Sequence, residues 1–258
     1  MHPLSTALLS RIEDAGLNAS APPQQRWVDG WLVRFSPGKA KRARCINAVA
    51  AGLQPLPEKL ALCQTLYRTA GMRMLFRVTP FSQPPGLDDW LAQRGYQRFE
   101  DTRVMACPAL TTTAATDWPE DVRVEQVDPE AYAHIVGDFR GTTLQGRQAH
   151  AERLCHSPVP YVGSVLRAAD GRPLACGQFA LEAELVGLYD VFTVPDMRGR
   201  GLSRRLCAHL LAQAHARGAR LAYLQVDAGN RPARSLYRQL GFADAYSYHY
   251  RALPSVGD

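Results

Sequence analysis

The chain has 258 residues, 46% of them hydrophobic, which suits one large or two small domains with a buried core. No apolar run nears the ~18 residues of a membrane span, and the N-terminus lacks the apolar core of a secretory signal. The net charge is +6. The six cysteines are scattered without disulfide spacing, so we expect reduced thiols in a cytoplasmic protein. The seven histidines are also dispersed, so we expect no metal site.

The first half of the chain is predicted to alternate helices with strands. An amphipathic helix near the N-terminus precedes a strand over residues 31–35. A helix over residues 60–71 then ends in glycine, and a strand over 72–78 and a short helix over 88–96 follow it.

A basic cluster follows the first predicted strand and consists of Lys39, Lys41, Arg42 and Arg44. Such clusters can attract phosphates or nucleic acid. This one has no interleaved aromatic residues, so we interpret it as a solvated loop and do not expect nucleic acid as a partner.

A small, polar segment over residues 111–117, flanked by Pro108 and Pro119, has the composition of a linker. We therefore predict two domains, over residues 1–110 and 118–258.

The second half begins with an alternating strand over residues 122–127, and helical stretches near 129–137 and 149–155 follow it. The Asp170-Gly171 turn then joins two predicted hairpin strands, over residues 161–168 and 173–181. A further apolar strand spans residues 185–193. This order predicts a mixed α/β fold with a central, mostly antiparallel sheet.

A turn with two glycines joins that last strand to an amphipathic helix. Its residues are Arg198, Gly199, Arg200, Gly201, Leu202, Ser203 and Arg204. Glycine lets a ligand approach the backbone, and the N–H groups and positive end of the helix attract anions. We expect a phosphate or pyrophosphate site here, although a plain strand–helix connection has the same local pattern. A dinucleotide-binding turn would need glycine at Arg204 and an acidic residue about 20 positions further on.

A strand over residues 220–226 follows this helix, and a second, shorter helix comes next. Asn230 is a good N-cap, and Gly241 is a good C-terminal stop. Tyr237 lies beside the apolar face of the helix, where it could be either a core residue or a functional hydroxyl group.

These two elements together resemble the GNAT superfamily of acyl-CoA-dependent N-acyltransferases. The family pattern for the glycine turn is Arg/Gln-x-x-Gly-x-Gly/Ala, and the turn here reads Arg198-Gly199-Arg200-Gly201-Leu202-Ser203. Residues 230–242 match every fixed position of Asn-x-x-Ala-x-x-Leu-Tyr-x-x-x-Gly-Phe. The resemblance covers about residues 122–252.

The resemblance implies roles for individual residues. The backbone of Val191, Phe192 and Thr193 would bind the pantetheine of acetyl-CoA, and the amides of residues 199–204 would hold its pyrophosphate. Asn230 would touch the pantetheine arm. Tyr237 would protonate the departing thiolate, a role that suits a phenol with a pKa of about 10.

The family often supplies a glutamate base at positions that correspond here to Gln225 and Gly187. Neither residue is a useful proton acceptor. Asp190 is the best substitute, and Asp227, His249 and Tyr189 are weaker candidates. An amine that arrives neutral, or that loses its proton to water, would need no base.

The predicted elements of the first half repeat those of the second at an offset of about 147 residues. We interpret the chain as two tandem GNAT-like domains, each with a mostly antiparallel sheet, of which the first is degenerate. In this alignment, residues 31–35 match the strand before the glycine turn. Residues 36–42, with one glycine, then stand in place of the phosphate turn, and Leu91 or Ala92 stands in place of the tyrosine.

The function predicted from these residues is transfer of an acetyl group from acetyl-CoA to a primary amine, by direct attack in a ternary complex. The acceptor could be a small amine, an amino acid, an antibiotic or a protein terminus, and longer acyl donors stay possible. The alternative is a catalytically silent acyl-CoA-binding sensor or interaction protein.

Overall fold

The computed structural model describes residues 4–111 and 118–254, so the predicted linker lies, except for Thr111, outside the described residues. The elements of the first half are α1 (Thr6–Ala19), β1 (Gln24–Val28), β2 (Trp31–Phe35), the 3-10 turn η1 (Lys41–Ala43), β3 (Ile46–Ala48), α2 (Leu56–Thr69), β4 (Phe76–Val78), α3 (Leu87–Ala92) and β5 (Gln97–Cys107). Those of the second half are β6 (Val122–Val127), α4 (Pro129–Phe139), α5 (Leu144–Cys155), β7 (Tyr161–Ala168), β8 (Pro173–Glu182), β9 (Leu185–Thr193), η2 (Pro195–Met197), α6 (Leu202–Ala216), β10 (Leu221–Asp227), α7 (Arg231–Gln239) and β11 (Ala243–Ala252). Within these ranges, no helix combines the length and the apolar character needed to cross a membrane.

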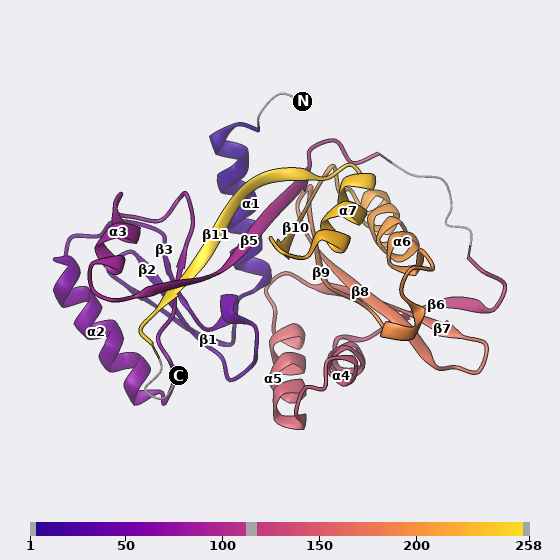
Figure 1. Ribbon diagram of the computed structural model, residues 1–258, viewed down its shortest axis with the longest axis horizontal. Helices are drawn as coiled ribbons and strands as arrows, with labels where there is room; N and C mark the ends of the chain where they lie inside the picture. The colour runs from indigo at the N-terminus through magenta and orange to yellow at the C-terminus, as the bar shows by residue number, and fades with distance from the viewer. Residues whose placement is uncertain (1–3, 112–117, 255–258) are drawn as a thin grey trace.

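The strands form one 11-stranded, mostly antiparallel sheet in the order β1-β2-β3-β4-β11-β5-β10-β9-β8-β7-β6. At its centre the two halves exchange strands: β11 lies between β4 and β5, and β5 lies between β11 and β10. Figure 1 shows β5 and β11 running side by side from one half of the molecule to the other. The mixed α/β fold is therefore confirmed, and the sheet is continuous between the halves.

Both halves contain three antiparallel strands followed by a helix, a strand, a helix and a last strand. In the first, β3 is parallel to β4 and α2 connects them. In the second, β9 is parallel to β10 and α6 connects them. The strand that corresponds to β9 is thus β3, and the alignment of residues 31–35 with that strand is wrong. Those residues form β2, which precedes β3 in an antiparallel pair. Residues 36–42 accordingly join two strands, and the true counterpart of the glycine turn is the segment between β3 and α2.

In the segment between β3 and α2, the Asp29 carboxylate occupies the position that an anion could take. The Asp29 side chain accepts hydrogen bonds from the backbone N–H groups of Leu53 at 2.9 Å and Gln54 at 2.8 Å, and the Nζ atom of Lys59 lies 2.9 Å from it. These backbone bonds and the lysine lower the pKa of Asp29 to about 2. A Cβ atom at Gly52 would lie 2.1 Å from Asp29, so this close approach requires glycine. In the first half, the Asp29 carboxylate therefore accepts the hydrogen bonds that the N–H groups of this turn could otherwise donate to a phosphate.

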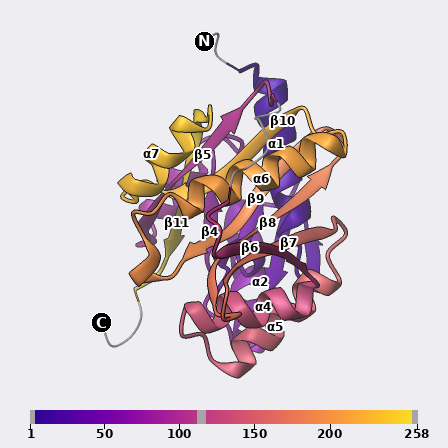
Figure 2. The same ribbon diagram turned by 90° about the vertical axis from the view of Figure 1, so that its right-hand side faces the viewer.

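Helices cover both faces of the sheet in the second half. Alternate strand residues point to opposite faces, so neighbours such as Val165 and Leu166 belong to different cores. One core includes residues from α1, α4 and α5, and the other includes the apolar stripe of α6. Figure 2 shows α6 and the pair α4 and α5 as separate layers. A third core around Trp31 and Phe76 lies in the first half.

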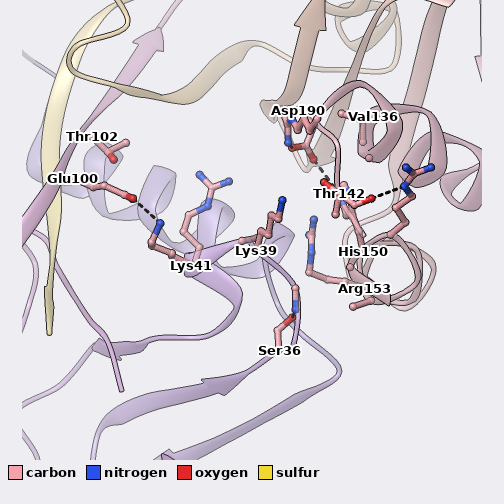
Figure 3. Close-up of a pocket in the computed structure, with 18 of the residues that line it drawn as sticks. Ser36, Lys39, Lys41, Glu100, Thr102, Val136, Thr142, His150, Arg153 and Asp190 are labelled. Carbon is pink, nitrogen blue, oxygen red and sulfur yellow. Dashed lines mark hydrogen bonds and ion pairs between the residues drawn. The ribbon is translucent and has the colours of Figure 1, made fainter. Parts of the chain in front are cut away.

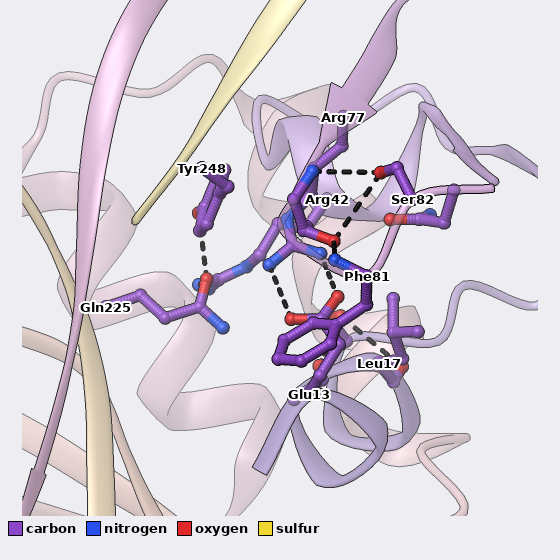
Figure 4. A network of polar contacts seen from close by, with 12 residues as sticks. Glu13, Leu17, Arg42, Arg77, Phe81, Ser82, Gln225 and Tyr248 are labelled. Carbon is purple, nitrogen blue, oxygen red and sulfur yellow. Dashed lines mark hydrogen bonds and ion pairs between the residues drawn. The ribbon is translucent and has the colours of Figure 1, made fainter. Parts of the chain in front are cut away.

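A buried ion pair joins α1 to the central strands. The Nη1 and Nη2 atoms of Arg77 in β4 donate to the carboxylate of Glu13 in α1, and the Tyr246 hydroxyl of β11 donates to the same carboxylate at 2.6 Å. The Arg77 guanidinium also lies 3.8 Å from the ring centroid of Tyr248. Figure 4 shows this network, with Arg42 beside it. Burial by itself would raise the pKa of Glu13, but the charge and hydrogen bonds of Arg77 hold it below its ordinary value.

We predict that Glu13→Gln lowers the free energy of unfolding at pH 7 by about 3–5 kcal/mol, because it leaves the Arg77 charge buried without its partner. Since the pKa of Glu13 is lower in the folded protein than in the unfolded chain, its contribution is present at neutral pH and is lost as the pH falls through the folded value. The variant should therefore also lose less stability than the wild type on acidification. Urea unfolding at several pH values measures both effects.

The matched control is Glu184→Gln, because Glu184 pairs with Arg11 at the surface, where both side chains are exposed. We expect its urea midpoint to stay near that of the wild type. Equal effects of the two substitutions would contradict a structural role for the buried pair.

Candidate active site

The site begins where β9 and β10 separate. The ladder between these strands ends at the pair Leu188 and Leu224, although β9 continues to Thr193 and β10 to Asp227. At Asp190, where φ is +51°, β9 contains a bulge that places two residues opposite Gly177 of β8. A bulge bends its strand and ends regular pairing. A gap therefore opens between the two strands at this end.

A groove of about 700 Å³ lies along this gap, on the face of the sheet covered by α6 and α7. Eleven of the residues predicted to bind the cofactor or to act in catalysis line it: Val191, Phe192, Thr193, Arg198, Gly199, Gly201, Leu202, Ser203, Arg204, Asn230 and Tyr237. Of the remaining two, Arg200 accepts a hydrogen bond from Arg205 through its carbonyl, and Asp190 faces a different cavity. The groove also includes positions that the motifs did not indicate, such as Ser235 and Gln239 of α7.

The glycine turn has the conformation that its residues allow. Gly199 and Gly201 have φ angles of +77° and +75°, which side chains other than glycine rarely adopt. Gly201 precedes α6, and no side chain caps this helix, so its first N–H groups have neither an intrahelical nor a side-chain partner. The Ser203 hydroxyl lies 2.6 Å from that of Thr193 and ties the turn to the end of β9. The turn can therefore donate several hydrogen bonds to an anion in the groove.

Asn230 and Tyr237 form the opposite wall of the groove. Asn230 caps α7 by accepting a hydrogen bond from the N–H of Ala233 at 3.2 Å, as its sequence context predicted. The Tyr237 ring packs against Phe242, with their centroids 6.0 Å apart. Burial raises the pKa of Tyr237 well above its ordinary value, and the nearby Cys207 thiol adds a smaller contribution in the same direction. The phenol stays protonated at neutral pH and can act as a proton donor.

A second cavity, of about 340 Å³, lies on the face covered by α4 and α5. We call it the acceptor cavity, after the role proposed for it in this protein. The segment 36–42 of the first half forms one wall, helices α4 and α5 form another, and Asp190 contributes from β9. Figure 3 shows these elements around a common space. The sequence did not indicate its arginines, which follow α4 directly or lie on α5, because nothing in their spacing distinguishes them from solvated residues.

Asp190 lies among cations in this cavity. Its carboxylate accepts hydrogen bonds from Arg140 at 2.8 Å and from Gln178 at 3.0 Å, and the Nε2 atom of His150 lies 3.3 Å away. Burial would raise the pKa of Asp190, but His150, Arg140 and Arg153 together hold it well below the ordinary value. A carboxylate with so low a pKa is a weak proton acceptor, which argues against its use as the base.

The positions of the expected glutamates hold no carboxylate. The Oε1 atom of Gln225 accepts hydrogen bonds from Arg42 and, at 2.8 Å, from Tyr248. At Gly187, a Cβ atom would lie 2.6 Å from the Tyr189 ring, so the packing of this ring requires glycine.

The weaker base candidates are engaged elsewhere. The hydroxyl of Tyr189 lies 2.8 Å from that of Tyr223 in the core, His249 pairs with Asp88, and Asp227 accepts a hydrogen bond from the N–H of Gly229.

The basic cluster is not simply a solvated loop. Lys41 pairs with Glu100 at 2.5 Å, and Arg42 extends inward to Gln225 with its guanidinium 5.6 Å from the centroid of the Tyr189 ring. The interpretation of this cluster as solvated is thus wrong for Arg42. Tertiary packing brings the loop against the second half, which local composition does not reveal.

Proteins that this chain resembles include acetyltransferases. A family described as "Probable histone acetyltransferase Rv0428c C-terminal" matches residues 6–251. The uncharacterized N-acetyltransferase YobR of Bacillus subtilis is 25% identical over 236 residues, which cover 88% of this chain and 91% of that protein. The ribosomal protein bS18-alanine N-acetyltransferase of Salmonella typhimurium is 35% identical over 77 residues, but these cover only 30% of this chain and 52% of that enzyme.

Solved structures share the fold. A GCN5-related N-acetyltransferase from Kribbella flavida has a TM-score of 0.71 at 18% identity, with 97% of each chain covered. A tandem GNAT protein from the clavulanic acid biosynthesis pathway has a TM-score of 0.63 at 16% identity, over 77% of this chain and 70% of that one. With the match over residues 6–251, these results show that the chain is an acetyltransferase of the Rv0428c C-terminal family, with the two-domain fold of the GNAT superfamily.

Proposed function

We propose that the protein transfers an acetyl group from acetyl-CoA to a primary amine within a ternary complex. The observation that carries this proposal is the bulge of β9, from which Asp190 faces the acceptor cavity while the next residue, Val191, lines the groove. The two cavities lie on opposite faces of the sheet, next to the gap between β9 and β10. A donor in the groove and an amine in the cavity can therefore meet at this gap.

The groove supplies the interactions that acetyl-CoA needs. The pyrophosphate binds the N–H groups at the start of α6, with Arg198 and Arg204 nearby. The pantetheine arm lies along the unpaired end of β9, whose backbone amides polarise the thioester carbonyl. This placement directs the acetyl group toward the gap.

The reaction forms one bond and breaks one. The neutral amine attacks the thioester carbonyl, the new C–N bond forms, and the C–S bond of the resulting tetrahedral intermediate breaks. Tyr237 donates its proton to the departing thiolate, the amine loses a proton to water, and water returns a proton to the Tyr237 phenolate. Positive side chains around the acceptor cavity disfavour the ammonium form of the bound amine, so the reaction does not require a carboxylate base.

We predict that Tyr237→Phe lowers kcat about 100-fold or more, because the thiolate loses its proton donor. Acetyl-CoA binding should change little, since the ring and its packing remain. Steady-state kinetics and calorimetry measure the two quantities. Tyr96→Phe is the control, because that hydroxyl pairs with Gln64 in the first half. A Tyr237→Phe enzyme as fast as the wild type at saturating substrate would remove the acid role.

Gly201→Glu should abolish coenzyme A binding in calorimetry, because a carboxylate at the start of α6 repels the pyrophosphate and fills its site. Gly171→Glu is a matched control. Gly171 also has a positive φ, of +86°, but it lies in the β7–β8 turn with no atom within 4 Å of its Cβ position. We expect the control to bind coenzyme A normally. Loss of binding in both variants would point to backbone strain rather than to the groove.

Asp190→Asn tests the role of this carboxylate. With a pKa well below neutrality, Asp190 is ionised throughout the range from pH 6 to 9, so it contributes no titration there. We expect the variant to raise the KM for the amine, since Arg140 and His150 lose their anchor, while the pH dependence of kcat keeps its midpoint. Loss of one limb of the pH profile with a large fall in kcat would instead identify Asp190 as the base.

A further inference from the structure

The acceptor cavity carries a strong excess of positive charge. Two carboxylates line it, Glu100 and Asp190, against six lysine and arginine side chains: Lys39, Lys41, Arg42, Arg140, Arg147 and Arg153. They come from three separate parts of the chain, namely the 36–42 segment, the turn after α4, and α5. The excess is therefore a property of the assembled cavity and not of a single helix.

Several of these cations already have partners within the protein. Lys41 pairs with Glu100, Arg140 with Asp190, and Arg147 with Asp138 at 3.0 Å. Arg42 donates to Gln225. These four side chains form the walls of the cavity rather than its free binding groups.

Lys39 and Arg153 differ from them. Among the described residues, no carboxylate oxygen lies within 4.0 Å of the charged nitrogens of either side chain. Arg153 is only 7% exposed, and its guanidinium lies 5.9 Å from the centroid of the Tyr161 ring. It interacts with the Tyr161 side chain and, at longer range, with the charge of Asp190. Figure 3 shows Lys39 and Arg153 directed toward the same space from different elements. The buried guanidinium thus has no directly paired carboxylate, and an anionic ligand in the cavity would supply one.

We infer that the acceptor is a small amine that also carries a carboxylate or phosphate group, which binds between Lys39 and Arg153. The inference rests on the proposed acetyl transfer for its reaction. The cavity volume of about 340 Å³ suits a small molecule. The same charges would repel a lysine- and arginine-rich tail, so the cavity does not fit a histone-like peptide.

The test compares acceptors that differ only in the anionic group. One arm pairs phosphoethanolamine with ethanolamine, and the other pairs free amino acids with their C-terminal amides. A lysine-rich peptide is the cationic comparison. Thiol release from acetyl-CoA gives kcat/KM, and calorimetry without acetyl-CoA gives binding. We expect the best acceptor to bear an anion and to exceed its neutral partner by about tenfold or more, with a difference that shrinks at high salt. A preference in the phosphoethanolamine arm would identify phosphate as the anionic group, and a preference in the amino-acid arm would identify carboxylate.

Two variants connect this preference to the cavity. Lys39→Ala removes an exposed side chain and should fold normally, while Arg153→Gln removes the buried guanidinium. Both should reduce the anion preference severalfold and leave acetyl-CoA binding unchanged. Arg26→Ala, an exposed position on the edge strand β1, is the control and should keep the wild-type preference.

The readouts separate this inference from the proposed function. Equal binding and turnover of anionic and neutral partners, or a preference for the lysine-rich peptide, would overturn the inference and leave acetyl transfer intact. Preferential binding of the anionic amines, reduced by Lys39→Ala but without turnover of any amine, would support the inference and count against the proposed reaction.

Discussion

Backbone hydrogen bonding of β5 and β11 at the centre of the sheet is the constraint on which the rest of this structure depends. Each strand belongs to one half in sequence and completes the sheet of the other half in space. Without β5, the inner edge of β10 would expose its backbone groups, and β4 would be exposed without β11. The halves are therefore coupled through main-chain bonds as well as through side-chain packing, and Glu13 and Arg77 reinforce the same junction.

This coupling places the first half, whose own turn is occupied by Asp29, beside the candidate site of the second half. The turn between β3 and α2 has its donors satisfied by Asp29, so the first half has no open counterpart of the glycine turn. It instead contributes the 36–42 segment, with Lys39, Lys41 and Arg42, to the acceptor cavity. The shared central strands hold this segment against α4 and α5.

The bulge at Asp190 links the backbone geometry to the chemistry. By bending β9 away from β10, it opens the gap between donor groove and acceptor cavity. The same residue anchors Arg140 and His150 in the acceptor cavity. A residue that the sequence suggested as a base is thus better understood as the support of a cationic site, because its surroundings stabilise the charged form so strongly.

The sequence by itself determined the donor side of the site. The glycine turn, the apolar stripe of α6 and the cap at Asn230 are local features whose geometry follows from neighbouring residues, and the structure places nearly all of them around one groove. Only the tertiary structure decided the acceptor side. Lys39 is more than 100 residues from Arg140 and Arg153 in the sequence, and no periodicity connects it to them. The exchange of β5 and β11 brings the loop that carries Lys39 to the segments that carry the two arginines. The parallel pairing of β3 with β4 corrected the match between the halves, because the partner of a strand depends on contacts that local patterns do not encode.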